Sequence, residues 1–110
     1  EVVQLPFSTS WVARIWKVKT IVVQIGNSDN KLPQAEWAEF VRRVDVIIRE
    51  HARTVYFFGG TENWAAWQRV CWVFDCDGSG STELKCRLTA ARKGFRQDAA
   101  AFTEGETEFI

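Results

Sequence analysis

The sequence predicts a ferredoxin-like α+β sandwich, in which an antiparallel four-stranded sheet carries both helices on one face. Strand-type and helix-type segments follow the order strand, helix, strand, strand, helix, strand, which is two βαβ halves. Right-handed crossovers then place the first and third strands at the centre of the sheet. A chain of 110 residues that is 46% hydrophobic is also long enough to bury one core without disulfide support.

The first half of the chain contains the clearest strand and the clearest helix. Residues 17–25 (KVKTIVVQI) are β-branched and apolar, which predicts a strand that stops at the turn-forming cluster GNSDN. Pro33 suits the first turn of the next helix, because its missing N–H is not needed there. From Trp37 the apolar residues recur at helical spacing, so the sequence predicts an amphipathic helix to about His51. Leu32 and Trp37 are spaced as a hydrophobic staple at its start.

The second half predicts two strands, a helix and a last strand, at 54–58 (TVYFF), 68–75 (QRVCWVFD), 83–95 and 98–103 (DAAAFT). A glycine pair ends the first of these strands. The loop before the helix contains Ser81 and Thr82, either of which suits a helix cap. Residues 17–110 are therefore predicted to form a single α+β domain, and residues 1–16 an extended N-terminal arm or a leader.

Strict alternation along the predicted strands makes both faces of the sheet apolar. The third strand has one face of Val70, Trp72 and Phe74 and another of Cys71, Val73 and Asp75. The second strand has one face of Val55 and Phe57 and another of Tyr56 and Phe58. The helices cover only one face, and exposed apolar sheet faces are rare on monomers. Two interpretations stay open: the second face is covered by the N-terminal arm or by a second copy in a homodimer, or it is a binding surface.

The charge and cysteine content exclude some partners and compartments. The 14 basic residues balance 14 acidic ones, which argues against nucleic acid and an anionic membrane as partners. The 3 cysteines leave one unpaired in any disulfide scheme, which favours a reducing compartment. No apolar run is long enough to cross a bilayer, so the sequence predicts a soluble, cytoplasmic protein.

No motif in the sequence predicts a cofactor, a metal or a catalytic residue. His51 is the single histidine, and at the end of a helix its predicted role is structural. The segment from Asp75 matches several positions of a calcium-binding loop, but Cys86 stands where that loop needs a bidentate glutamate. The cysteines lack zinc-binding spacing, and no phosphate-binding glycine loop is present.

The segment GGTENWAAWQRVCWVFD holds three of the 6 tryptophans of the chain. Trp72 falls in a predicted strand, and therefore in the core or in a dimer interface. Trp64 and Trp67 lie three apart in a loop, where one helical turn would place them side by side. Loops on a rigid scaffold often carry recognition, and tryptophan is enriched at binding hot spots. The sequence thus predicts a partner-binding site of Glu62, Asn63, Trp64 and Trp67, with closure of the core as the alternative role of the two tryptophans.

Three stretches, TIVVQIGNSDN, FFGGTENWAAWQ and TEGETEF, together resemble small uncharacterised proteins of actinobacterial phages and their hosts. The resemblance covers roughly residues 17–110. None of the stretches is a mechanistic motif, so the resemblance assigns no functional residue. It implies a cytoplasmic accessory protein, encoded by a phage, that acts by binding a host protein.

Three functions compete on this basis. The leading one is a non-enzymatic module that engages a protein through the tryptophan loop and an adjacent aromatic sheet edge. The second is single-stranded RNA binding by stacking on sheet aromatics, although the third strand lacks the basic-glycine-aromatic pattern of such modules. The third is a small dimeric ferredoxin-like enzyme with His51, Asn63 and Trp64 near a cavity between subunits.

Overall fold

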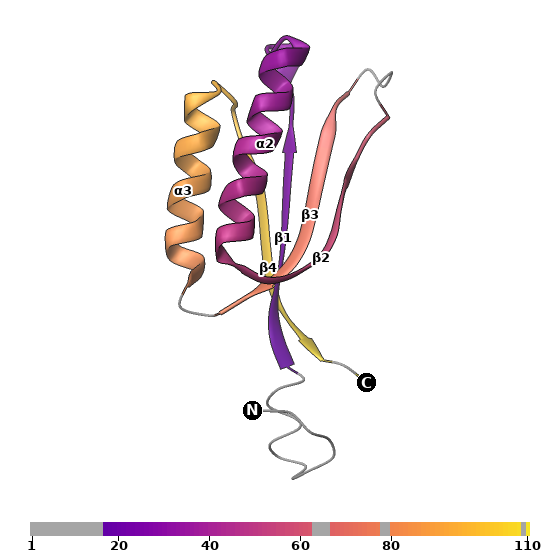
Figure 1. Ribbon diagram of the computed structural model, residues 1–110, viewed down its shortest axis with the longest axis vertical. Helices are drawn as coiled ribbons and strands as arrows, with labels where there is room; N and C mark the ends of the chain where they lie inside the picture. Colours follow the sequence, from indigo (N-terminus) through magenta and orange to yellow (C-terminus); the bar gives the residue numbers. More distant parts are fainter. Residues whose placement is uncertain (1–16, 63–66, 78–79, 109) are drawn as a thin grey trace.

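The computed structural model describes residues 17–62, 67–77, 80–108 and 110 (Figure 1). The elements, in chain order, are β1 (Lys17–Gly26), the 3-10 helix η1 (Ser28–Asn30), α2 (Gln34–His51), β2 (Ala52–Gly60), β3 (Arg69–Cys76), α3 (Ser81–Gly94) and β4 (Ala101–Glu108). The predicted N-terminal arm, residues 1–16, lies outside the described residues.

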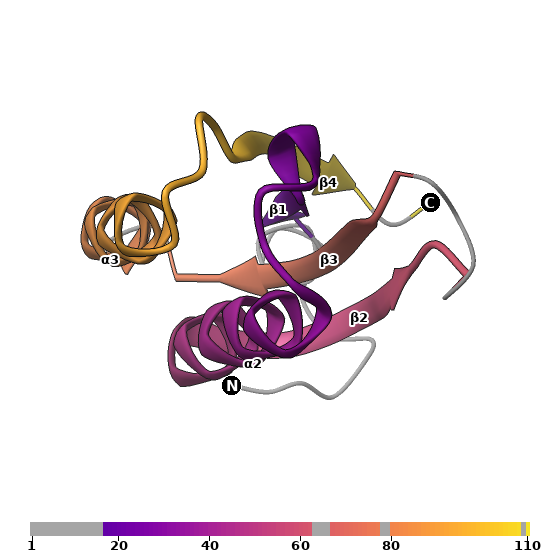
Figure 2. The ribbon, with the colours of Figure 1, turned by 90° about the horizontal axis from the view of Figure 1, so that it is seen from above.

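The strands form one antiparallel four-stranded sheet in the order β2-β3-β1-β4. Both helices lie on the same side of this sheet, as Figure 2 shows from above. The first and third strands are central, as the crossover argument requires. The predicted ferredoxin-like α+β fold is therefore confirmed, and the other side of the sheet, here called the open face, carries no helix of the described chain.

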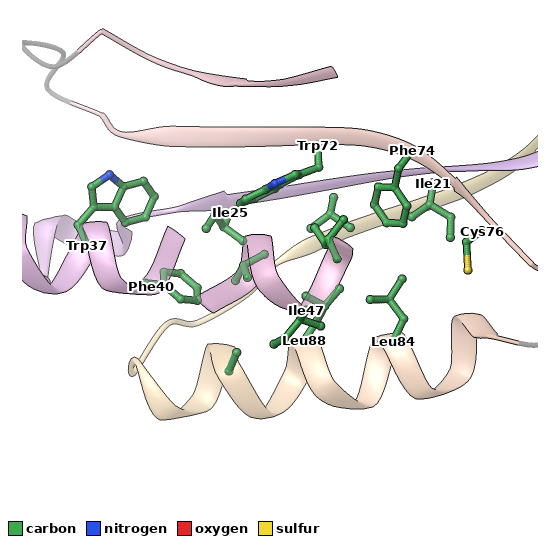
Figure 3. Close-up of a cluster of buried hydrophobic side chains, with 14 of the residues drawn as sticks. Ile21, Ile25, Trp37, Phe40, Ile47, Trp72, Phe74, Cys76, Leu84 and Leu88 are labelled. Atoms are coloured by element: carbon green, nitrogen blue, oxygen red, sulfur yellow. The ribbon is translucent and has the colours of Figure 1, made fainter. Parts of the chain in front are cut away.

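The core lies between the sheet and the two helices, and Figure 3 shows its principal side chains. Ile21, Trp72, Phe74 and Leu84 are all fully buried, at 0% exposed. The indole nitrogen of Trp72 donates a hydrogen bond of 2.9 Å to Oδ1 of Asp45 on α2, so its polar atom is satisfied at the margin of the core. Trp72 is thus a core residue, one of the two roles that the sequence predicts for it.

Helix α2 begins and ends close to the predicted positions. Pro33 is its N-cap residue, and the amide of Trp37 donates to the Pro33 carbonyl oxygen at 2.8 Å. Leu32 and Trp37, the positions of a hydrophobic staple, are both buried in the core. His51 is the last residue of α2, and its Nδ1 lies 2.9 Å from the carbonyl oxygen of Ile47. The histidine therefore makes a local contact that closes the helix end.

The boundaries of the last helix and strand differ from prediction. Ser81 is the first residue of α3, Gly80 is the N-cap residue, and no side chain caps the helix. The last strand begins at Ala101 and not at residue 98, and it continues through the acidic stretch TEGETE to Glu108. The reason is main-chain pairing with β1, which runs in unbroken register from Gln24 opposite Ala101 to Lys17 opposite Glu108. An edge strand held by its backbone needs no alternating apolar pattern.

Strand β2 departs from strict alternation because its register with β3 shifts between Val55 and Phe57. Val55 pairs with Phe74 and Phe58 with Trp72, so both share the helix-covered face, while Phe57 lies on the open face opposite Val73. The predicted faces of β2 are therefore wrong. A bulge adds one residue to a strand, so every residue after it points to the opposite face from the one that strict alternation predicts. The hydrophobic pattern of the sequence does not reveal the position of a bulge.

Candidate functional site

Trp67 is the one tryptophan of the predicted site that the structure describes. It lies two residues before β3 and is 79% exposed. Glu62, which follows the end of β2, is exposed as well. Asn63 and Trp64 lie outside the described residues, so only the two ends of the predicted loop are placed. Trp67 does not close the core, which excludes the structural alternative for this residue.

A network of side-chain amides, two of which are buried, begins at Gln68, the residue after Trp67. Gln68 exchanges two side-chain hydrogen bonds with Gln34 at the start of α2, at 2.7 and 3.0 Å. Asn27 donates through Nδ2 to Oε1 of Gln68 at 3.2 Å, and its backbone amide donates to the Gln68 carbonyl oxygen at 3.1 Å. Because Asn27 and Gln68 are buried and these amides satisfy one another, Trp67 projects from a hydrogen-bonded base.

Asn27 also organises the turn that connects β1 to α2. Its side chain accepts from the amide of Leu32 and donates to the carbonyl oxygen of the same residue, both at 2.9 Å. The side chain of Gln97, which is also buried, accepts from the amide of Ser28 at 2.8 Å. In the sequence, Asn27 and Gln97 cannot be told from ordinary turn residues. What distinguishes them is that their side chains are buried, and the sequence does not show burial.

The predicted aromatic sheet edge is exposed along β2. Tyr56, Phe57 and Phe58 are 48%, 53% and 47% exposed. The Phe57 ring lies against Gly59, since a Cβ at that glycine would come within 2.8 Å of Cζ of the ring. Phe58 stacks on Trp72 with ring centroids 5.4 Å apart, and the Arg49 guanidinium lies 5.8 Å from the Phe58 centroid. The edge of β2 therefore presents an exposed aromatic surface, in which the Phe57 ring packs on Gly59 and the Phe58 ring on Trp72.

One carboxylate is buried among the strands of the open face. Asp75 accepts a hydrogen bond of 2.7 Å from the amide of Thr54 and one of 3.0 Å from the hydroxyl of Tyr56. Partial burial is the main cause that raises the pKa of Tyr56 above its ordinary value, and the hydrogen bond to the Asp75 carboxylate raises it further. Tyr56 therefore stays a neutral donor, and Asp75 has partners for both of its oxygens.

Two neighbouring grooves lie at the end of the sheet next to Trp67. The larger, of about 320 Å³, lies among the start of β3, the β1–η1 turn and the start of β4, and Trp67 forms part of its wall. The smaller, of about 260 Å³, lies on the open face beside Phe57 and Gly59. Both grooves are lined by Gln24 and Arg69, so they meet at these two side chains. A third groove, of about 220 Å³, lies between α3 and β4.

The described part of the chain has free cysteines that differ in burial. It contains no group of three or more histidine, cysteine, aspartate or glutamate side chains placed to hold a metal ion. Cys76 is buried, and burial is the main cause that raises the pKa of its thiol. Among the same residues, no helix has the length and apolar character required to span a bilayer.

Comparison with solved structures supports the fold and leaves the function open. No family model matches the chain, and neither does any curated protein. The chain is similar in structure to a dimeric ferredoxin-like protein of unknown function from Thermobifida fusca, with a TM-score of 0.53 and 10% sequence identity. The similarity covers 80% of this chain and 90% of that one. At this identity it shows a shared ferredoxin-like fold alone.

Proposed function

We propose that the protein is a non-enzymatic interaction module that binds a protein partner through Trp67 and the aromatic edge of β2. The observation that carries the proposal is the 79% exposure of Trp67 beside a network of satisfied amides. Tryptophan offers a large contact area with only two rotatable side-chain bonds, so ordering it at an interface costs little conformational entropy. Glu62 is exposed beside it, and Asn63 and Trp64 belong to the same proposed site through the sequence.

The aromatic edge supports the same conclusion. Phe57 and Phe58 point to opposite faces of the sheet, and about half of each side chain is exposed. Edge strands present unpaired backbone groups that partners can use, and aromatic residues are enriched at protein interfaces. The actinobacterial phage resemblance fits a phage-encoded accessory protein whose partner is a host protein. The free cysteines fit the reducing conditions of the cytoplasm.

A substitution at Trp67 tests the proposal. The variant W67A is expected to keep the fold, because the side chain contributes little to the core, and to lose most of the captured partner. Circular dichroism checks the fold, and affinity capture from host extract, quantified by mass spectrometry, checks binding. The matched control is V46A on α2, where the valine is 41% exposed on another part of the surface. Equal capture by W67A and the wild type would contradict the proposal.

We also propose that the centre of the open face, around Val22 and Val73 and away from the grooves, pairs two copies of the chain in a homodimer. Val22 and Val73 lie opposite each other at the centre of this face, and both are only half-buried. The ferredoxin-like protein of similar structure is dimeric, which supports self-association here. Single-stranded RNA binding and a small enzymatic activity stay predictions from the sequence, since no contact or groove of the described residues favours either.

A further inference from the structure

The two grooves beside Trp67 meet at Arg69, and we propose that they bind a partner segment that carries a carboxylate next to an apolar side chain. This inference rests on the proposed function, because it gives the chemistry of the partner at the Trp67 site. The carboxylate pairs with the Arg69 guanidinium, and the apolar side chain packs against Trp67 or Phe57.

The position of Arg69 follows from strand pairing. It is the first residue of β3, lies opposite Gly26 of β1, and shares the open face with Cys71 by alternation. A Cβ at Gly26 would lie 3.9 Å from Cγ of Arg69, so the arginine stem runs over the glycine. The backbone of Arg69 is held by Thr61, whose amide donates to the Arg69 carbonyl oxygen at 2.9 Å and whose hydroxyl accepts from its amide at 3.1 Å.

The guanidinium of Arg69 has no ion-pair partner in the described ranges. Eight other lysines and arginines there do pair with carboxylates: Lys19, Lys31, Arg42, Arg49, Arg53, Lys85, Arg87 and Arg96. Arg43, Arg92 and Lys93 also have no ion pair within those ranges. Arg43 and Lys93 line none of the three grooves, and Arg92, which lines the third groove, donates to the backbone carbonyl oxygens of Gln97 and Asp98. Arg69 is therefore an available cation at the junction of two grooves.

The surroundings of Arg69 define what can pair with it. The grooves are lined on its two sides by Trp67 and by Phe57, with Ile25, Val70, Ala99 and Ala101 as further apolar walls. A planar guanidinium in such a setting prefers a carboxylate, which it binds with two parallel hydrogen bonds. Asp29 also lines the larger groove, so an acidic group that docks is favoured beside Arg69 and disfavoured beside Asp29. The charges thus give the bound segment an orientation.

The test uses two short peptides as probes, acetyl-Gly-Glu-Phe-Gly-amide and its glutamine counterpart, titrated into the whole chain and followed by NMR. The glutamate peptide is expected to bind about tenfold more tightly than the glutamine peptide, with saturable shifts at the Trp67 indole and at Arg69. In R69Q the preference for glutamate is expected to disappear. In the control R43Q, which removes an exposed arginine of α2, it is expected to persist.

The inference is overturned if neither peptide gives a saturable shift, if the two bind equally, or if R69Q keeps the preference. Thermal unfolding of R69Q against the wild type verifies that the exposed substitution leaves the fold intact. The proposed function fails separately, when W67A captures the partner as well as the wild type does. Loss of capture in W67A together with an unchanged peptide preference in R69Q would retain the interaction module and reject the role of Arg69.

Discussion

Gly60 lies at a close contact between β2 and β3. A Cβ at this position would lie 2.4 Å from the carbonyl oxygen of Arg69 and 3.0 Å from Cγ2 of Val70. The first of these atoms belongs to the backbone of a paired strand, so it cannot move aside without disturbing the sheet. The glycine is therefore required by contact and not by its backbone conformation, since no described glycine has a positive φ.

The variant G60A is expected to lower the free energy of unfolding by roughly 1–3 kcal/mol, because the added methyl group forces the strands apart. Urea unfolding followed by circular dichroism measures the change. The control is G94A at the end of α3, where a Cβ meets nothing within 4 Å. This control is expected to be neutral or to stabilise by up to about 1 kcal/mol, since alanine is the better helix former. Equal stability of G60A and the wild type would show that the strands adjust.

The individual site residues differ in how far the sequence could predict them. Trp67 is conspicuous in any sequence because tryptophan is rare and large. Arg69 is one of many arginines, and what distinguishes it is its pairing opposite Gly26 and its place at two grooves without an ion pair in the described ranges. Asn27 and Gln68 are likewise marked by burial alone.

Among the elements, α2 was predicted most accurately because its apolar stripe is long and regular. Phe40, Val44, Ile47 and Ile48 are all buried against the sheet and α3, as the helical period requires. β2 and β4 were predicted less accurately. β2 contains register shifts, and β4 is held by main-chain bonds to β1, and neither feature produces an apolar period.

The variant I48A tests the buried face of α2. Ile48 is 0% exposed, so removing its side chain is expected to cost roughly 2–5 kcal/mol of unfolding free energy through lost burial and the cavity left behind. Guanidinium unfolding provides the measurement. On the same helix V46A, at an exposed position, is expected to change stability by less than about 0.5 kcal/mol. Similar losses in the two variants would contradict the assignment of the two faces.

At the scale of the whole molecule, the proposed homodimer places the open face between two copies of the chain. V22K places a charge at its centre, opposite Val73 and Thr103, and is expected to convert a dimer into a monomer because two lysines would be buried at the interface. Analytical ultracentrifugation measures the change in mass. The control V46K alters an exposed valine of α2 and is expected to leave the dimer intact. A monomeric wild type, or a V22K variant that stays dimeric, would reject the homodimer.

The sequence by itself determined the order of the elements, the central position of β1 and β3 and the buried face of α2. It also identified Trp67 as a candidate binding residue. Each of these follows from local hydrophobic periodicity, from turn chemistry or from the handedness of crossover connections. All three depend on residues that are close together in the sequence or on rules that hold for any chain. Only the tertiary structure decided that Trp72 is core while Trp67 is exposed, that a bulge turns Phe57 to the open face, and that Arg69 lies where two grooves meet. These depend on contacts between segments distant in the chain, and such contacts leave no periodic pattern in the residues that make them.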